Sequence, residues 1–254
     1  MELRGTAAIV TGGGTGIGRA VCLDLARAGA RGVVVNYSRS AAEAEATVGE
    51  LAALGADAVA VKADVSRESE VKDMVALAAE RFGRIDVLVN NAGTTRFIPV
   101  NDLDAVTDEV WQAILGVNLM GPWYASRAAA PHLRAAHGCI VNVASIAGLR
   151  ASGSSLPYGV SKAALTHLTH WLAIALAPEV RVNAVNPGLV ATRWFREPFG
   201  EDRANAQEEA FAKRSPIGVV ATPEHVSQAV MGFIRSDAVT GQHLIVDGGV
   251  SAGY

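Results

Sequence analysis

The sequence predicts an α/β fold in which a doubly wound, seven-stranded parallel sheet is flanked by helices. Short runs rich in Val and Ile alternate with longer Ala-rich amphipathic stretches, which is the pattern of strand–helix–strand crossovers. The apolar runs are continuous, as expected of strands that helices cover on both faces. No linker or shift of composition divides the 254 residues, so 1–254 is interpreted as a single domain.

Each predicted element follows from its local pattern. The β-branched apolar runs predict seven strands, in order Thr6–Thr11, Gly32–Tyr37, Ala58–Lys62, Asp86–Asn90, Cys139–Ala144, Arg181–Asn186 and His243–Val246. The amphipathic stretches between them predict helices at Ile17–Ala28, Ala41–Leu54, Glu68–Arg81, Asp104–Arg134, Tyr158–Leu176 and Glu224–Arg235. The fourth helical stretch is expected to break near Gly116, because glycine weakens a helix interior.

One segment departs from this alternation. From Ala191 to Thr222 the pattern is irregular, and four aromatic residues lie among mixed charges, at Trp194, Phe195, Phe199 and Phe211. A connection this long within a compact domain is usually a lid, a binding loop or a disordered tract. Because the aromatic residues argue against disorder, residues 191–222 are predicted to form a substrate lid.

Composition narrows the class of protein. The formal net charge is −3 and no cluster of Lys and Arg occurs, which argues against nucleic acid as a partner. Cys22 and Cys139 lie in apolar surroundings, as is usual in a reducing compartment. The six histidines show no spacing typical of metal ligands, so no metal is predicted. With no leader and no apolar run of membrane-spanning length, we expect a cytoplasmic protein without a membrane partner.

A glycine-rich turn follows the first predicted strand and leads into a helix. Its sequence over Thr11–Gly18 is TGGGTGIG, in which Gly12, Gly14, Gly16 and Gly18 give the backbone room and Thr15 and Ile17 open the helix. Such a turn lets the backbone approach a pyrophosphate, and the helix N-terminus presents free N–H groups to it. This segment is therefore a candidate dinucleotide-binding turn.

The end of the second strand indicates which dinucleotide is bound. Asn36 stands eighteen residues after Gly18, where an acidic residue would bind the adenosine ribose of NAD. The neutral Asn36 is followed by Ser38, Arg39 and Ser40, which suit a ribose 2′-phosphate. The sequence therefore predicts that NADP(H) is favoured over NAD(H), although an exposed loop arginine is the simpler interpretation of Arg39.

Three residues form the candidate catalytic group. Tyr158 and Lys162 are four positions apart, on one face of a helix, and Ser145 lies thirteen residues before Tyr158. A tyrosine that exchanges a proton near neutral pH needs its phenolate stabilised by about 4 kcal/mol. A cation at about 4 Å supplies that much in a partly buried site, so Lys162 is expected to lower the pKa of Tyr158. Such a pair alone would more often be structural.

Together these motifs resemble the classical short-chain dehydrogenase/reductase family, including its 3-oxoacyl-[acyl-carrier-protein] reductase-like members. The resemblance rests on Thr11–Gly18, Asp64-Val65, Asn90–Gly93, Asn118, Ser145, Tyr158–Lys162 and Pro187-Gly188 with Thr192, in family order and spacing. It implies a Rossmann fold, a nicotinamide cofactor and hydride transfer between the cofactor and a ketone or secondary alcohol. It also implies a homodimer or homotetramer.

The resemblance also implies residue roles. Asp64 would accept from the adenine amino group, and Lys162 would bind the nicotinamide ribose. Asn118 would hold a water against Lys162, and Thr192 would bond the nicotinamide carboxamide. The other residues that it places along the cofactor are Val65, Asn90, Asn91, Ala92, Gly93, Pro187, Gly188 and Val190.

The aromatic residues of the lid and one apolar helical segment bear on the substrate and on assembly. The lid aromatics favour an apolar or mixed ketone or alcohol, and reduction of a 3-oxoacyl group on acyl carrier protein is the alternative. The segment Ala163–Val180 carries no Lys or Arg for such an acidic carrier. Ala163–Ala177 is apolar nearly all round and includes Trp171, which indicates either subunit packing or burial beneath the lid. A non-catalytic dinucleotide sensor is disfavoured, because all four candidate catalytic residues are present.

Overall fold

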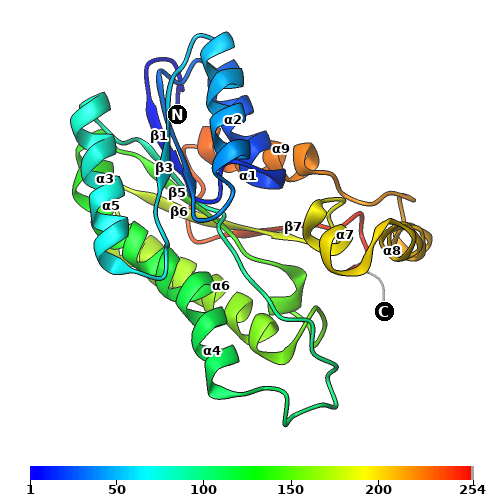
Figure 1. Ribbon diagram of the computed structural model, residues 1–254. Coiled ribbons are helices and arrows are strands. Elements are labelled where there is room, and N and C mark those ends of the chain that lie inside the picture. The colour runs from blue at the N-terminus through cyan, green and yellow to red at the C-terminus, as the bar shows by residue number, and fades with distance from the viewer. Residues whose placement is uncertain (253–254) are drawn as a thin grey trace.

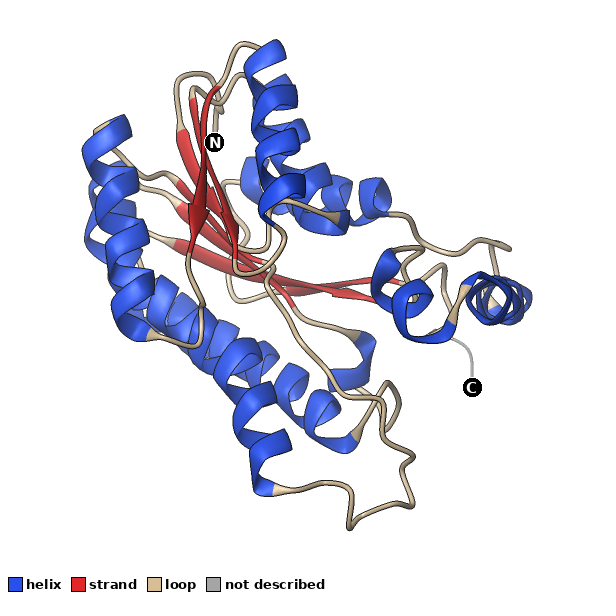
Figure 2. Ribbon diagram, viewed as in Figure 1, coloured by secondary structure: helices blue, strands red, loops and turns tan. Residues whose placement is uncertain are grey.

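The computed structural model describes residues 1–252, so any role of Tyr254 lies outside the described residues. Seven strands form one sheet in the order β3-β2-β1-β4-β5-β6-β7, and every neighbouring pair is parallel. Figure 2 shows the strands in the middle of the molecule with helices on both sides. The predicted fold class is confirmed.

All seven predicted strands are present, with ends that shift by one residue at most. They are β1 (Ala7–Val10), β2 (Gly32–Tyr37), β3 (Asp57–Lys62), β4 (Val87–Asn90), β5 (Cys139–Val143), β6 (Arg181–Pro187) and β7 (His243–Val246). Alternate residues of one strand face opposite layers, because side chains alternate along a strand. In β1, Ala8 and Val10 join the hydrophobic cluster on one face, while Ala7 and Ile9 join the cluster on the other. This double burial explains the continuous apolar runs.

Helices cover both faces of the sheet. They are α1 (Gly16–Arg27), α2 (Ala41–Ala53), α3 (Glu68–Phe82), α4 (Asp108–Leu115), α5 (Gly121–Ala136), α6 (Leu156–Ala175), α7 (Arg193–Phe199), α8 (Glu201–Arg214) and α9 (Pro223–Arg235). In Figure 1, α1, α2 and α9 lie on one side of the sheet, and α3, α5 and α6 lie on the other. No helix within residues 1–252 is both long enough and apolar enough to cross a lipid bilayer.

The long helical stretch after β4 differs from the prediction at its start. The helix begins at Asp108 instead of Asp104, because the Asp102 carboxylate accepts from the Ala105 N–H and closes a turn there. Its predicted break near Gly116 is confirmed, since residues 116–120 form a π-helix, η1 (Gly116–Met120), between α4 and α5. Such π-turns commonly occur at functional sites, and this one contains Asn118.

The segment 191–222 is not irregular, as the sequence pattern had indicated, but forms two helices, α7 and α8. Arg196 joins them through ion pairs with Glu201 and Glu208. The two ends of the segment meet in a bridge between Val190 and Ala221. Figure 1 shows α7 and α8 standing apart from the two helical layers.

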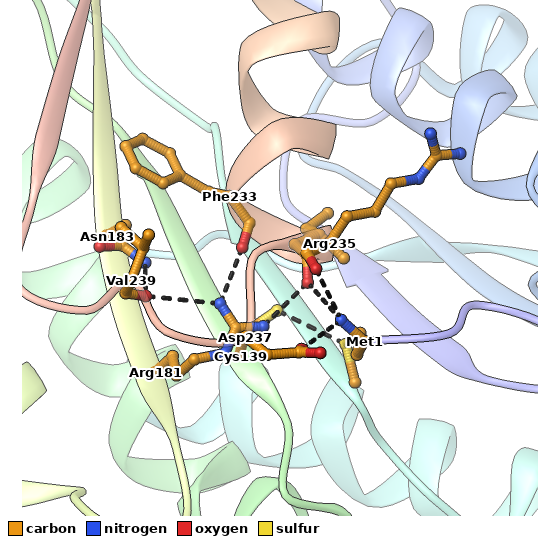
Figure 3. Close-up of polar contacts among 9 residues, drawn as sticks. Met1, Cys139, Arg181, Asn183, Phe233, Arg235, Asp237 and Val239 are labelled. Atoms are coloured by element: carbon orange, nitrogen blue, oxygen red, sulfur yellow. Dashed lines mark hydrogen bonds and ion pairs between the residues drawn. The ribbon is translucent and has the colours of Figure 1, made fainter.

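The amino end of β6 is tied to the end of α9 (Figure 3). The Arg181 guanidinium donates to the Phe233 carbonyl at 2.7 Å and to the Ile234 carbonyl at 2.8 Å. The Met1 amino group pairs with Asp237 at 2.5 Å. The Arg181 contacts satisfy carbonyls that a helix C-terminus leaves without partners. They lie at the amino ends of the strands.

Candidate active site

The candidate site residues gather at the carboxyl ends of the strands. The chain order reverses between β1 and β4, which are neighbours in the sheet, and ligands of open α/β sheets bind at such a switch point. The glycine-rich turn follows β1 and Asn91–Gly93 follows β4, so both flank this point. Ser145 follows β5, and Pro187 ends β6.

The glycine-rich turn has the shape of a phosphate cradle. Gly12 and Gly16 have φ of +62° and +52°, in the left-handed region that favours glycine. A Cβ at Gly18 would overlap the Gly12 carbonyl, and one at Gly14 would stand 2.9 Å from the Ala44 nitrogen. Thr15 is the extended N-cap of α1, and its side chain makes no capping bond. The first N–H groups of α1, from Gly16, Ile17 and Gly18, are therefore open to an anion.

Two predicted cofactor residues brace this turn with their side chains. Asn36 accepts from the Gly12 N–H at 3.2 Å and donates to the Ala63 carbonyl at 3.0 Å. The Asn91 amide donates to the carbonyls of Thr11 at 2.9 Å and Gly12 at 3.0 Å. Their side chains thus fasten the turn to β2, β3 and β4, and a direct contact with the cofactor stays a prediction.

The loop after β2 presents the residues predicted to read the adenosine ribose. Ser38 and Arg39 are exposed, and within residues 1–252 Arg39 makes no ion pair. Asp64, at the end of β3, accepts from the N–H and hydroxyl of Ser66, so part of its carboxylate is already used by a local turn. Val65 is buried against Gly121 at the start of α5.

The candidate catalytic residues meet between β5 and α6. The Ser145 hydroxyl accepts from the Ala147 N–H at 3.1 Å, at the start of a 3₁₀ turn, η2 (Ile146–Gly148). Gly148 lies so close to the Lys162 backbone that a Cβ would stand 2.5 Å from its carbonyl carbon, which holds the Ser145 loop against α6. Lys162 Nζ donates to the Val143 carbonyl at 2.9 Å and lies 5.8 Å from the centre of the Tyr158 ring.

The electrostatics of Tyr158 differ from the prediction. Burial raises the pKa of Tyr158, and a hydrogen bond with Ser145 lowers it in part. Burial also lowers the pKa of Lys162 to about 8, because charging a buried amine is unfavourable. Lys162 directs its amine to a backbone carbonyl, so the groups of the protein alone leave Tyr158 protonated near neutral pH. Lowering of the Tyr158 pKa by Lys162 with the cofactor bound stays a prediction.

Asn118 joins the loop after β4 to α6. Its side-chain oxygen accepts from the Thr94 N–H at 2.8 Å, and its amide donates to the Thr94 carbonyl and the Ser161 hydroxyl, each at 3.0 Å. A Cβ placed on Gly93 would lie 3.6 Å from the Asn118 oxygen and 3.8 Å from Lys162 Nζ. Asn118, Gly93 and Lys162 therefore surround one small space, and the predicted water between Asn118 and Lys162 stays a prediction.

Aromatic side chains of the predicted lid form a wall beside Tyr158, whose position the sequence did not predict. Thr192 caps α7, and its methyl group would lie 3.5 Å from a Cβ at Gly16. The Trp194 ring centre lies 6.2 Å from that of Tyr158. Phe97, from the loop after β4, packs against Phe195 at 5.4 Å and Phe199 at 4.7 Å between ring centres. The lid aromatics signalled such a wall, but only the fold brings Phe97 to it.

The end of β6 completes the site. The Ser145 hydroxyl lies 3.5 Å from the Pro187 carbonyl. Gly188 donates to the Val246 carbonyl at 3.0 Å, and a Cβ there would stand 2.7 Å from Asp247 and 2.8 Å from Phe211 of α8. Glycine at this position therefore lets Phe211 and Asp247 approach the backbone at the end of β6. Val190, at the base of the lid, pairs with Ala221.

This geometry fits a dinucleotide cofactor. The cradle of Gly12–Gly18 suits a pyrophosphate, and Gly93 leaves open a space beside Asn118, Lys162 and Trp194 that a side chain would fill. Ala92 lies beside Gly93, and its N–H donates to the Thr11 hydroxyl at 3.0 Å. Within residues 1–252 no cluster of three or more His, Cys, Asp or Glu residues has the geometry of a metal site.

Comparisons with known proteins show which family of proteins the chain is similar to. The family model described as enoyl-(acyl carrier protein) reductase matches residues 12–251. A Streptomyces violaceoruber protein, named as granaticin polyketide synthase ketoacyl reductase 2, is 47% identical, covering 95% of this chain and 94% of its own. The 3-oxoacyl-[acyl-carrier-protein] reductase of a Synechocystis species is 36% identical over 96% of both chains.

A solved structure has the same fold. It is the crystal structure of a protein from Burkholderia xenovorans assigned to the short-chain dehydrogenases/reductases. Its TM-score is 0.90 at 32% identity, and the match covers 98% of each chain.

Proposed function

The chain belongs to the short-chain dehydrogenase/reductase family of oxidoreductases, and on that premise we propose that it reduces a ketone to a secondary alcohol with NADPH. The observation that carries the proposal is the meeting of Ser145, Tyr158 and Lys162 beside the glycine-rich turn. The cofactor would lie along that turn and along Gly93, Lys162 and Thr192, and when bound it supplies the hydride. The remaining chemistry belongs to the side chains of the protein.

Tyr158 is proposed to donate its phenolic proton to the carbonyl oxygen of the substrate. Burial raises the pKa of Tyr158, so the phenol holds its proton at neutral pH and is ready to act as an acid in reduction. The Ser145 hydroxyl, which the Ala147 N–H holds in place, is proposed to hold the same carbonyl oxygen. In oxidation of the alcohol Tyr158 would take the proton back, as microscopic reversibility requires.

Lys162 is proposed to bind the cofactor beside Tyr158, and Asn118 is proposed to support the loop next to Lys162. Lys162 is 4% exposed and already placed by the Val143 carbonyl, so its ammonium can bind the ribose hydroxyls of the nicotinamide without a large rearrangement. Asn118 fixes the loop after β4 against Ser161, next to Lys162. This support keeps the cofactor side of the site open at Gly93.

The preference for NADPH is proposed from the loop after β2. Arg39 and the hydroxyls of Ser38 and Ser40 are proposed to bind the ribose 2′-phosphate of NADP. Asn36 is neutral, so it would not repel that phosphate as an acidic residue would. A charged hydrogen bond of about 1.5–3 kcal/mol corresponds to discrimination of roughly 10- to 100-fold between the two cofactors.

The aromatic wall of the lid supports a substrate with an apolar body. Trp194 lies beside Tyr158, and Phe97, Phe195 and Phe199 continue the wall, so an apolar body bound against it would place its ketone near the acid. A 3-oxoacyl group on a carrier protein is the second candidate, which the names of the two reported relatives favour. The lack of Lys and Arg over Ala163–Val180 argues against docking of an acidic carrier on α6.

Assembly into a homodimer or homotetramer is proposed from α6. Trp171 and Ile174 are 62% and 73% exposed, so the lid does not bury this helix, and burial beneath the lid is wrong as an explanation of its apolar face. A cytoplasmic location stays a prediction.

The test compares wild type with Tyr158→Phe. NADPH oxidation is followed with a panel of free ketones and 3-oxoacyl thioesters, and NADPH affinity is measured separately by fluorescence. The variant is expected to lose roughly 10²–10⁴-fold in kcat and to keep its NADPH affinity. Full activity of the variant would exclude Tyr158 as the acid. If wild-type protein binds NADPH but reduces no carbonyl in the panel, the proposed reduction is not supported.

A further inference from the structure

Arg193 connects the lid to the loop that is proposed to read the cofactor ribose. It is the first residue of α7, and its Nη2 donates to the Ser40 hydroxyl at 2.7 Å. Its Nη1 lies 2.9 Å from the carboxylate of Glu43, in the first turn of α2. Its Nε lies 3.5 Å from Glu197. One guanidinium therefore spans two segments that are about 150 positions apart in the sequence.

The loop that the Arg193 guanidinium contacts is the one proposed to bind the cofactor phosphate. Ser38, Arg39 and Ser40 form the loop assigned above to a ribose 2′-phosphate, and Arg193 already bonds to one of its hydroxyls. A guanidinium is planar and presents paired N–H donors, which match the oxygens of a phosphate. Two arginines, one from each side, would then face the same group.

Glu43 gives Arg193 a second effect on a phosphate. Hydrogen bonds from its own backbone and from Arg193 lower the pKa of Glu43, so this carboxylate is ionised at neutral pH. An ionised carboxylate beside Ser40 would repel a phosphate. Arg193 neutralises that charge, so the arginine reduces the repulsion that an anion would meet at this loop.

The present partner of Arg193 can be exchanged at little cost. The Arg193 and Glu43 side chains are 42% and 46% exposed, and exposed ion pairs contribute little to stability. A phosphate that carries more negative charge than a carboxylate is a stronger partner for the same guanidinium.

We infer that Arg193 is a specificity residue for the phosphorylated cofactor: it binds the 2′-phosphate together with Arg39 and Ser40, and thereby couples recognition of that phosphate to the position of the lid. This inference rests on the proposed preference for NADPH. It assigns a second cation to the phosphate. This cation comes from α7, which is far in sequence from the loop that holds Arg39.

The test is a binding measurement on Arg193→Gln. Dissociation constants are measured by calorimetry for NADPH and NADH, and for adenosine 2′,5′-bisphosphate and 5′-AMP as probes without a nicotinamide. The variant is expected to bind NADPH and the bisphosphate about 10-fold more weakly, while NADH and 5′-AMP change by less than about 2-fold. Arg193→Lys keeps the charge and is expected to recover part of the loss.

Glu43→Gln is the matched control, because it removes the same ion pair and leaves the cation in place. It is expected to keep or increase the preference for the phosphorylated ligands. The inference is overturned if Arg193→Gln weakens phosphorylated and unphosphorylated ligands equally. It is also overturned if Glu43→Gln reproduces the loss, since the ion pair itself would then be responsible.

Failure of this inference is distinguishable from failure of the proposed cofactor preference. If wild-type protein binds NADH as tightly as NADPH, the preference itself is absent. If wild type prefers NADPH and Arg39→Gln reduces that preference but Arg193→Gln does not, only the role of Arg193 is rejected.

Discussion

At the scale of single residues, the surroundings of Tyr158 set the pKa of its phenol. Its ring packs near Trp194, and burial raises its pKa, while a hydrogen bond with Ser145 lowers it in part. Ser145 is held by the Ala147 N–H at the start of η2, so its hydroxyl is placed before any substrate binds. The pKa of Tyr158 therefore depends on its burial in α6 and on Ser145, which precedes η2.

Replacement of Ser145 tests this control. Ser145→Ala removes the hydrogen bond that lowers the pKa of Tyr158, so this pKa is expected to rise further. Oxidation of an alcohol needs the phenolate, and its rate is expected to reach its plateau at a higher pH than in wild type. Activity is also expected to fall roughly 10²-fold or more, because one donor to the substrate oxygen is lost.

The measurement is the pH–rate profile in the oxidative direction, with Ser145→Thr as a control that keeps a hydroxyl. An alkaline limb at the same pH in Ser145→Ala and wild type would contradict the role given to Ser145.

Lys162 carries a second prediction, on stability. Burial lowers its pKa from 10.5 to about 8, so between these values the unfolded chain binds more protons than the folded one. Stability due to this group therefore rises with pH through that window, and the cost of charging it is fully present below pH 8. Lys162→Met lacks this dependence. The stability of wild type relative to the variant is expected to rise by about 3 kcal/mol between pH 7.5 and 10.5.

Urea unfolding of both proteins at the two pH values measures the difference in their free energies of unfolding. The contributions of other titrating groups are common to both proteins and cancel in this difference. Parallel stability curves for the two proteins would show that the Lys162 amine is not desolvated.

Among the elements, the glycine-rich turn has no room for a side chain at Gly18, whereas α2 has room for one at Gly49. A Cβ at Gly18 would overlap the Gly12 carbonyl and stand 2.6 Å from the Asn91 amide, which braces the turn. Gly49, in the interior of α2, is exposed, and a Cβ there would have no atom within 4 Å. Only the first glycine is required by packing.

Alanine at each position tests this contrast. Gly18→Ala is expected to destabilise the protein by about 1–3 kcal/mol through overpacking, and to weaken dinucleotide binding because the cradle must shift. Gly49→Ala is expected to stabilise it by about 1 kcal/mol, because alanine is the better helix former. Thermal unfolding and NADPH binding measure both effects. A Gly18→Ala variant that binds NADPH as wild type does would show that the cradle tolerates a side chain.

Helices α7 and α8 show why the local sequence pattern did not predict helices over residues 191–222. Within α8 only Ala204 is buried, so the helix has no apolar face that its sequence could reveal. Polar contacts hold it, including Lys213 with Glu209 at 2.7 Å and Arg196 with Glu208 at 2.7 Å. Gly200, with φ of +79°, separates it from α7. Such contacts become visible only once the helices are placed.

At the scale of the whole molecule, the apolar surface of α6 has no cover within residues 1–252. Trp171 and Ile174 are exposed, and Leu244 and Ile245 of β7 are 47% and 38% exposed. Large exposed apolar side chains of this kind commonly mark contacts between proteins. The wild-type protein is therefore expected to be larger in solution than the 26.3 kDa chain.

Light scattering coupled to size exclusion at micromolar concentration tests this expectation. Ile174→Asp is expected to shift the protein towards the monomer, because a charge in an apolar contact is costly. Val100→Asp places the same charge at an 81% exposed loop position and is expected to leave the mass unchanged. A monomeric wild-type protein would reject assembly through α6.

The sequence by itself determined the seven strands and the helices that cover the sheet, because side-chain periodicity reports burial one element at a time; it did not reveal α7 and α8. It also located the turn at Gly12–Gly18 and the spacing of Tyr158 and Lys162, since both depend on neighbours in the chain. Only the tertiary structure decided that Lys162 bonds to Val143, and that Asn36 braces the glycine-rich turn. The same holds for the reach of Arg193 to Ser40. These partners are distant in sequence, and their distances follow from how the layers pack, which no local pattern contains.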